Sequence, residues 1–263
     1  MLMRKKKWLT VVAILLLGAL LMGLLLDGVQ GLYREMTFNW SEATEAERRV
    51  KEYADAHGIP FRKYPESIIA LLERNPETET FVLEYPVYEP EEYDLSEIDR
   101  SGGVPLLLQW DQRWGYEQYG SDCIAITGCG PTCLAMVGYY LTGDGETFDP
   151  AAVAEYAEKE GYYAAGYGSS WTLISEGAVR LGLDVTEIPL VEKRMKDNLE
   201  VGNPIICAMG PGDFTSSGHY IVIVGLQDGM FVINDPNSVE NSQKLWSYEQ
   251  IQGQIRNLWV IRE

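Results

Sequence analysis

A run of uncharged residues, Trp8–Leu26, restricts the structure of this chain more than any other feature of the sequence. As a helix with a rise of about 1.5 Å per residue it would extend about 28 Å, close to the thickness of a bilayer's hydrocarbon core. The preceding cluster Arg4–Lys7 is expected to stay in the cytoplasm. The segment that follows, Asp27–Gly31, does not resemble a signal-peptide cleavage site. We therefore predict that residues 1–31 form a cytoplasmic basic stub and a transmembrane signal anchor, with the rest of the chain extracytoplasmic.

The rest of the chain is strongly acidic. The net charge of the whole sequence is −18, and residues 1–31 contribute +3, which leaves −21 for the other residues. Nucleic-acid binding depends on Lys and Arg contacts with phosphates, so this charge argues against a nucleic-acid partner. It would also repel an anionic lipid or cell-wall surface, whereas solubility explains it simply.

Residues 32–103 are the least domain-like part of the sequence. We predict a helical stalk or pre-domain, with a helix over Ser41–His57 capped by Ser41 and a second helix over Pro65–Leu72. The segment Tyr85–Gly103, rich in acidic residues with Pro and Gly, is expected to be an extended linker.

From Val104 onward aromatic residues, glycines and apolar runs become dense, which indicates one domain over residues 104–263. Its patterns predict helices first and strands later, and therefore an α+β fold with an antiparallel sheet. The expected helices are Pro131–Leu141, Pro150–Glu160, Trp171–Leu181 and Val191–Glu200, and the expected strands are Pro204–Met209, His219–Leu226, Met230–Asp235 and Trp259–Ile261.

The string Gly128-Cys129-Gly130-Pro131-Thr132 carries the clearest chemical signal. Pro131 suits the first turn of a helix, so Cys129 is expected at the helix start, where free N–H groups and the helix dipole favour an anion. A thiolate is the nucleophilic form of cysteine, which makes Cys129 a candidate nucleophile. Cys133 lies one turn later on the apolar stripe and is interpreted as a core residue.

Only two histidines are available to serve as a proton partner. His219 opens an apolar strand, whereas His57 lies in a charged segment and is interpreted as a surface residue. The residue that orients the imidazole depends on the hairpin register. A two-residue turn at Asp228-Gly229 would put Asn234 on the His219 face, and a three-residue loop would put Asp235 there. The pattern alone leaves both registers open.

These segments together resemble the C39-like peptidase family, which belongs to the papain-like cysteine peptidases. The resemblance rests on Gln109-Trp110-Asp111, on Gly128–Thr132 with Leu134-Ala135-Met136, on Gly218-His219-Tyr220 and on Asn234-Asp235-Pro236, and it covers residues from about Val104 to the C-terminus. The region from Pro65 to Pro86 is also similar to a pre-domain found beside such domains in Gram-positive bacteria.

The resemblance implies a papain-like fold and a role for each matched residue. Cys129 would be the nucleophile, His219 the general base, Asp235 the orienting acid and Gln109 an oxyanion donor beside the Cys129 backbone N–H. It therefore favours the three-residue loop, or an equivalent bulge in the strands. Nineteen residues separate Gln109 from Cys129, whereas in transporter-linked relatives only a few separate the Gln from the Cys, so Gln112 and Gln118 compete for the donor role.

The leading hypothesis is a cell-surface thiol hydrolase that cleaves a peptide or protein substrate and needs no cofactor. The alternatives are an amide hydrolase of peptidoglycan with the same Cys-His pair, and a non-catalytic peptide-binding domain. A metal site is not expected, because Cys123, Cys129, Cys133 and Cys207 lack the close spacing of common zinc motifs.

Overall fold

The computed structural model describes residues 29–166 and 168–263, which form two compact units. One unit holds the described residues up to Arg74 together with Val82–Val87, and the other holds Asn75–Phe81 together with Tyr88–Glu263. The predicted membrane anchor lies almost entirely outside the described residues. None of the helices within the described ranges is long and apolar enough to cross a membrane.

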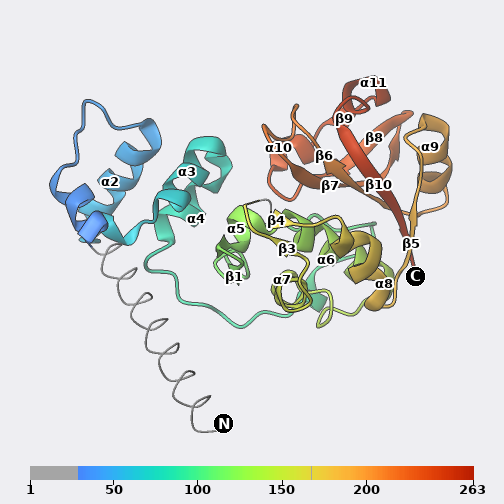
Figure 1. The fold of residues 1–263 in the computed structure, drawn as a ribbon, viewed down its shortest axis with the longest axis horizontal. Coiled ribbons are helices and arrows are strands. Elements are labelled where there is room, and N and C mark those ends of the chain that lie inside the picture. The colour runs from blue at the N-terminus through green and yellow to red at the C-terminus, as the bar shows by residue number, and fades with distance from the viewer. Residues whose placement is uncertain (1–28, 167) are drawn as a thin grey trace, which may run out of the picture. The chain divides into compact units, whose positions relative to one another are not determined.

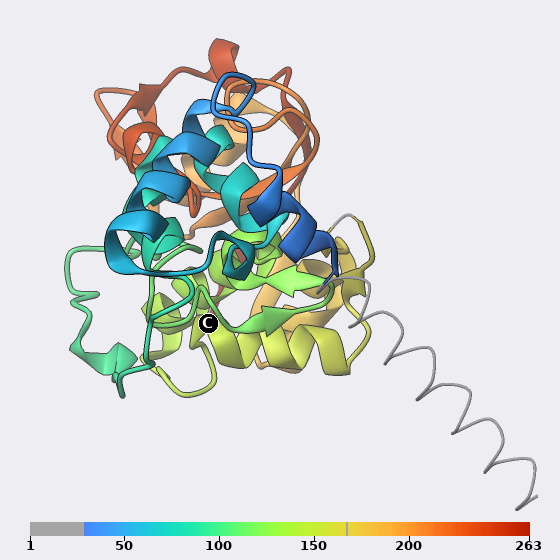
Figure 2. The same cartoon turned by 90° about the vertical axis from the view of Figure 1, so that its left-hand side faces the viewer.

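The N-terminal unit is helical, as Figure 2 shows. Residues 29–36 are helical, and α2 (Glu45–His57), a 3-10 turn η1 (Phe61–Lys63) and α3 (Glu66–Arg74) follow. The predicted cap at Ser41 is wrong. Thr44 caps α2 instead, because its hydroxyl accepts the Glu47 N–H while the Glu47 carboxylate accepts the Thr44 N–H.

The helices and short turns of the rest of the chain are as follows: η2 (Pro76–Thr78), α4 (Glu79–Glu84), η3 (Leu95–Glu97), α5 (Ile124–Thr127), α6 (Cys129–Thr142), α7 (Pro150–Lys159), the π-helix η4 (Leu173–Gly177), α8 (Ala178–Arg180), α9 (Glu192–Glu200), α10 (Val239–Ser242) and α11 (Tyr248–Ile251). The predicted helix over Trp171–Leu181 is thus a π-helix followed by one short α-helical piece.

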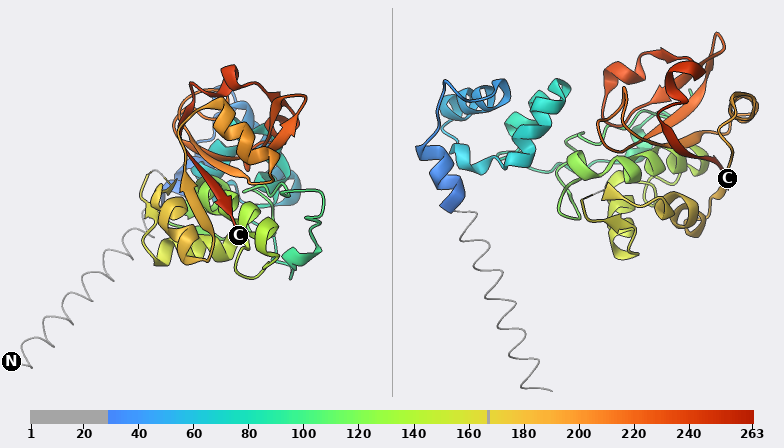
Figure 3. Two further views of the ribbon diagram at one scale, coloured as in Figure 1. Left: turned by 90° about the vertical axis from the view of Figure 1, so that its right-hand side faces the viewer. Right: turned by 45° about the horizontal axis from the view of Figure 1, so that its top comes forward.

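The main sheet of the second unit has six strands in the order β5-β10-β6-β7-β8-β9, and every neighbouring pair is antiparallel. These strands are β5 (Asp184–Glu187), β6 (Ile205–Met209), β7 (His219–Gln227), β8 (Met230–Asn234), β9 (Leu245–Trp246) and β10 (Ile255–Arg262), and the short pairs are β1 (Gln118–Tyr119) with β2 (Asp122–Cys123) and β3 (Tyr163–Ala164) with β4 (Gly168–Ser169). The predicted α+β class with helices and an antiparallel sheet is confirmed (Figures 1 and 3).

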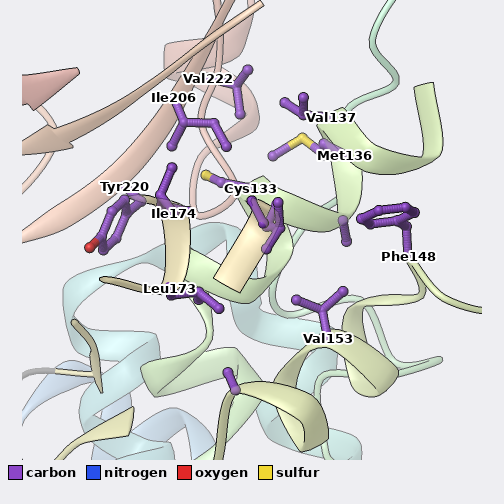
Figure 4. Packing of buried hydrophobic residues seen from close by; sticks show 14 of the residues in the cluster. Cys133, Met136, Val137, Phe148, Val153, Leu173, Ile174, Ile206, Tyr220 and Val222 are labelled. Carbon is purple, nitrogen blue, oxygen red and sulfur yellow. The ribbon is translucent and has the colours of Figure 1, made fainter. Parts of the chain in front are cut away.

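Alternating side chains of the central strands supply two separate cores. Ile206, Tyr220 and Val222 pack with α6 and α7 on one face, while Ile221 packs with α9 and α11 on the other. Figure 4 shows the first core, in which Cys133 and other α6 side chains lie near the sheet residues. Cys133 is fully buried, as predicted. This packing fixes α6, and with it Cys129, against the sheet that carries His219.

Candidate active site

Cys129 is the first residue of α6. The short helix α5 ends at Thr127, and Gly128 separates the two helices. The first N–H groups of a helix have no partner within it, and the helix dipole there favours negative charge. Cys129 is partly accessible, whereas Cys123, Cys133 and Cys207 are buried, and all four are free thiols. The helix start therefore presents a single accessible sulfur.

A close approach of the backbone holds this helix start in place. A Cβ atom added to Gly130 would lie 2.6 Å from the Ser169 Oγ, so only glycine fits there without a shift. Ser169 in turn shares a hydrogen bond of 2.7 Å with the buried hydroxyl of Tyr119. The strand β4 thus packs directly against the first turn of α6.

His219 and Asp235 lie within hydrogen-bond distance of each other, with 2.7 Å between Nε2 and Oδ1. Both side chains are largely shielded, with 8% and 1% of their surfaces exposed. Cys129 also acts on this imidazole, because its hydrogen bond and its charge both raise the pKa of His219. One imidazole therefore interacts with both a carboxylate and a thiol.

This environment favours the protonated imidazole. Burial by itself lowers the pKa of His219, but the charge and hydrogen bond of Asp235, together with the hydrogen bond and charge of Cys129, outweigh burial and raise this pKa to about 10. A proton on His219 at neutral pH stabilises a thiolate on Cys129. The arrangement can thus hold a thiolate–imidazolium pair.

The hairpin register explains how Asp235 comes to share a face with His219. The loop is the two-residue turn Asp228-Gly229, whose residues have φ of 52° and 77°, and Gln227 pairs with Met230. The three-residue loop favoured by the resemblance is therefore wrong. A β-bulge between Ile223 and Gly225 supplies the odd residue instead, so that Asn234 pairs with Val222. Asp235, one residue further, then falls on the face of His219.

The alternative orienting residue, Asn234, points elsewhere. Its Nδ2 donates to the Val104 carbonyl at 3.0 Å, and the residue is buried. This hydrogen bond ties the end of β8 to the segment where the aromatic-rich part of the chain begins.

Gln109 lies against the turn that precedes Cys129. Its Nε2 donates to the Ala125 carbonyl at 2.7 Å, and its buried Oε1 has no hydrogen-bond partner. An amide nitrogen has two N–H groups, so one donor remains beyond the bond to Ala125. The oxyanion role of Gln109 stays a prediction. Gln118, a competing candidate, is exposed and bonds to Gly120 and Asp122 carbonyls.

Sequence reasoning missed the residues that hold Asp235. The Asn237 N–H donates to Oδ1 and the Asn241 Nδ2 donates to Oδ2, both at 2.9 Å, while the Asp235 N–H donates to the Ser242 Oγ at 2.9 Å. These residues lie in a short polar segment that shows no periodicity. Only the proximity of two asparagines to Asp235 in the sequence could have suggested their role.

His57, the other histidine, is exposed in the N-terminal unit, where it stacks on Tyr53. Within the described residues, no group of three or more His, Cys, Asp or Glu side chains is arranged to hold a metal ion.

Comparison with known sequences assigns this chain to a family. The sequence model of the Peptidase_C39 like family matches residues 102–262. The chain belongs to this family. Its fold is accordingly that of the papain-like C39 peptidase domains.

Two solved structures are similar to this chain. The peptidase domain of Streptococcus ComA, a bifunctional ABC transporter involved in a quorum-sensing pathway, has 23% sequence identity and a TM-score of 0.42, with 60% of this chain and 98% of that chain covered. A Bacillus anthracis protein assigned as a C39-like peptidase has 16% identity and a TM-score of 0.37, with 66% and 98% covered. Among curated protein sequences no significant match was found.

Proposed function

We propose that this member of the C39-like family is an active cysteine peptidase that uses Cys129, His219 and Asp235. The observation that carries the proposal is the imidazole of His219, which lies 2.7 Å from the Asp235 carboxylate and whose pKa is raised by both Asp235 and Cys129. Membership of the family supports a peptidase but does not by itself distinguish an active enzyme from an inactive one.

The proposed reaction is acyl transfer through a covalent intermediate. The Cys129 thiolate attacks the carbonyl carbon of a peptide bond, and the negative charge moves to the carbonyl oxygen. Backbone N–H groups at the start of α6 and the second N–H of the Gln109 amide are the candidate donors to this oxygen. The tetrahedral intermediate collapses when the His219 imidazolium gives its proton to the leaving amine, which leaves a thioester on Cys129.

Hydrolysis of the thioester completes the cycle. Neutral His219 removes a proton from a water molecule, which attacks the thioester carbonyl and releases the carboxylic acid. The thiolate leaves, and the proton remains on His219, so the starting ion pair is restored. Asp235 keeps the imidazole oriented and stabilises its charged form throughout.

The direct test is a proteome-wide cleavage profile. The wild-type protein should generate new peptide N-termini that are missing from Cys129→Ala and His219→Gln digests. His57→Gln is the matched control, because His57 is exposed in the other unit and should keep full activity. Identical profiles from the wild type and Cys129→Ala would contradict cleavage by Cys129 and favour the non-catalytic alternative.

We further propose that the catalytic unit faces outward on the cell membrane. This rests on the uncharged run Trp8–Leu26 behind four basic residues. Protease shaving of intact cells should remove the catalytic unit and leave the N-terminus in the membrane fraction. Recovery from the medium of a protein that begins near residue 30 would contradict the anchor.

A further inference from the structure

The loop that follows Asp235 is held by a segment far away in the sequence. The Glu77 carboxylate accepts the Val239 N–H at 2.6 Å, the Glu240 N–H at 3.0 Å and the Ser238 hydroxyl at 3.1 Å. These donors include the first N–H groups of α10, which have no partner within the helix. A carboxylate bound to several N–H groups forms hydrogen bonds stronger than those between neutral partners.

A second contact holds Asn237, one of the three residues between Asp235 and α10. The Asn237 carbonyl accepts the Asn75 Nδ2 at 2.5 Å and the Trp110 Nε1 at 3.0 Å. The backbone N–H of the same Asn237 donates to Asp235 Oδ1. The Asn75 side chain therefore holds the carbonyl of the residue whose N–H bonds the carboxylate of the proposed triad.

Each of the two contacts holds a part of the chain that itself donates a hydrogen bond to the Asp235 carboxylate. Glu77 fixes the start of α10, and α10 carries Asn241, whose Nδ2 bonds Asp235 Oδ2 at 2.9 Å. Asn237 reaches Oδ1, the oxygen that also faces His219. Asn75 and Glu77 belong to the same compact unit as the active site, although they precede the region that the family match covers.

We propose that Glu77 and Asn75 are positioning residues of the active site, which hold the loop that presents Asp235 to His219. Neither residue touches the reacting atoms. The inference rests on the proposed function, since it concerns the precision of the proposed triad. It implies that the segment 75–81 helps to position the active site, although it precedes the region matched by the family.

The test uses two measurements on the full-length chain that need no substrate. NMR titration of labelled histidine reports the pKa of His219, and the chain's only other histidine is the exposed His57. The rate of alkylation by iodoacetamide at neutral pH reports the reactivity of Cys129. Asp235→Asn provides the reference for complete loss of the carboxylate charge.

Glu77→Ala should lower the pKa of His219 toward its ordinary value, because Asp235 and Cys129 are the groups that raise it and Asp235 would lose its fixed position. Alkylation of Cys129 should slow about 10-fold, less than the 10²-fold effect of a misplacement of about 1 Å. Glu77→Gln keeps one acceptor oxygen and should fall between Glu77→Ala and the wild type, which also covers the case in which the alanine variant does not fold.

Gln250→Ala is the matched control. Its Oε1 accepts the Ser247 N–H at 2.8 Å and caps α11, another four-residue helix of the same unit. It should cost stability without moving the pKa of His219. If folded Glu77→Ala and Glu77→Gln keep the wild-type pKa and alkylation rate, the positioning role is overturned while the proposed function stands. If the wild-type His219 titrates like a free histidine, the proposed ion pair fails instead.

Discussion

The two sides of the site are built in different ways. The helix side is local: Gly128, Cys129 and Gly130 adjoin in sequence, and α6 presents the sulfur at its first residue. The sheet side is assembled from distant pieces, because His219 begins β7, Asp235 follows the end of β8, and residues near position 75 hold the Asp235 loop. The position of the nucleophile therefore depends on the start of one helix, whereas the position of the histidine and its carboxylate depends on the pairing register of β7 with β8 and on long-range contacts.

The largest expected effect concerns the helix side. Burial raises the pKa of Cys123 to about 12, and burial together with the nearby Cys129 raises the pKa of Cys133 well above its ordinary value. Each unit by which the pKa of a thiol exceeds the pH lowers its thiolate fraction about tenfold. At pH 7 about one Cys123 in 10⁵ should therefore be a thiolate, and its alkylation should be slower than that of a fully ionised thiol by about the same factor. Mass spectrometry after brief alkylation should find Cys129 labelled first.

Denatured protein is the control for this experiment. Without burial or a helix start, the four cysteines should be labelled at similar rates. Equal labelling in the folded protein would contradict the special environment of Cys129.

The next prediction addresses the sheet side. Asp235→Ala removes the carboxylate that orients His219 and should lower kcat/KM on the order of 10²-fold or more. Asn234→Ala removes the bond to the Val104 carbonyl and should cost about 1 kcal/mol of unfolding free energy with little change in kcat/KM. Kinetic assays and chemical denaturation of both variants measure the ranking, and the reverse ranking would assign the orienting role to Asn234.

A smaller effect is expected when the helix start is crowded. Gly130→Ala places a methyl group 2.6 Å from the Ser169 Oγ, so β4 or α6 must shift. We expect a loss of about 1–3 kcal/mol of unfolding free energy, typical of overpacking, and slower alkylation of Cys129. Gly253→Ala, with no atom within 4 Å of the added carbon, is the control for chemical denaturation. Unchanged stability in Gly130→Ala would mean that β4 does not restrain α6.

A final expected effect is a pH dependence of stability that belongs to the sheet side. The pKa of His219 is about 10 in the folded chain, against an ordinary value of 6.5. Because the folded pKa is raised, the stabilising contribution is complete below pH 6.5 and disappears as the pH rises through 10. The difference in unfolding free energy between the wild type and His219→Gln should therefore shrink over this range. A constant difference would argue against a charged His219.

The sequence by itself determined the parts of this protein that depend on neighbouring residues. Gly128–Thr132 indicated a cysteine at a helix start, and the β-branched runs on both sides of Asp228-Gly229 indicated the hairpin. The order of helices and strands indicated the α+β class. The pattern alone did not decide whether Asn234 or Asp235 orients His219, and the family resemblance favoured Asp235.

Only the tertiary structure decided how Asp235 reaches His219. Successive side chains of a strand point to opposite faces of the sheet. A two-residue turn alone would put Asn234 on the face of His219, but one bulged residue between Ile223 and Gly225 puts Asp235 there instead. Gly225, a glycine inside the strand, is a local sign of such a bulge, but the register shift itself is visible only in the strand pairing. The hydrogen bonds of Asn75 and Glu77 to the Asp235 loop could not be predicted from the sequence either. Contacts between positions more than 160 residues apart leave no periodic signal in a single sequence.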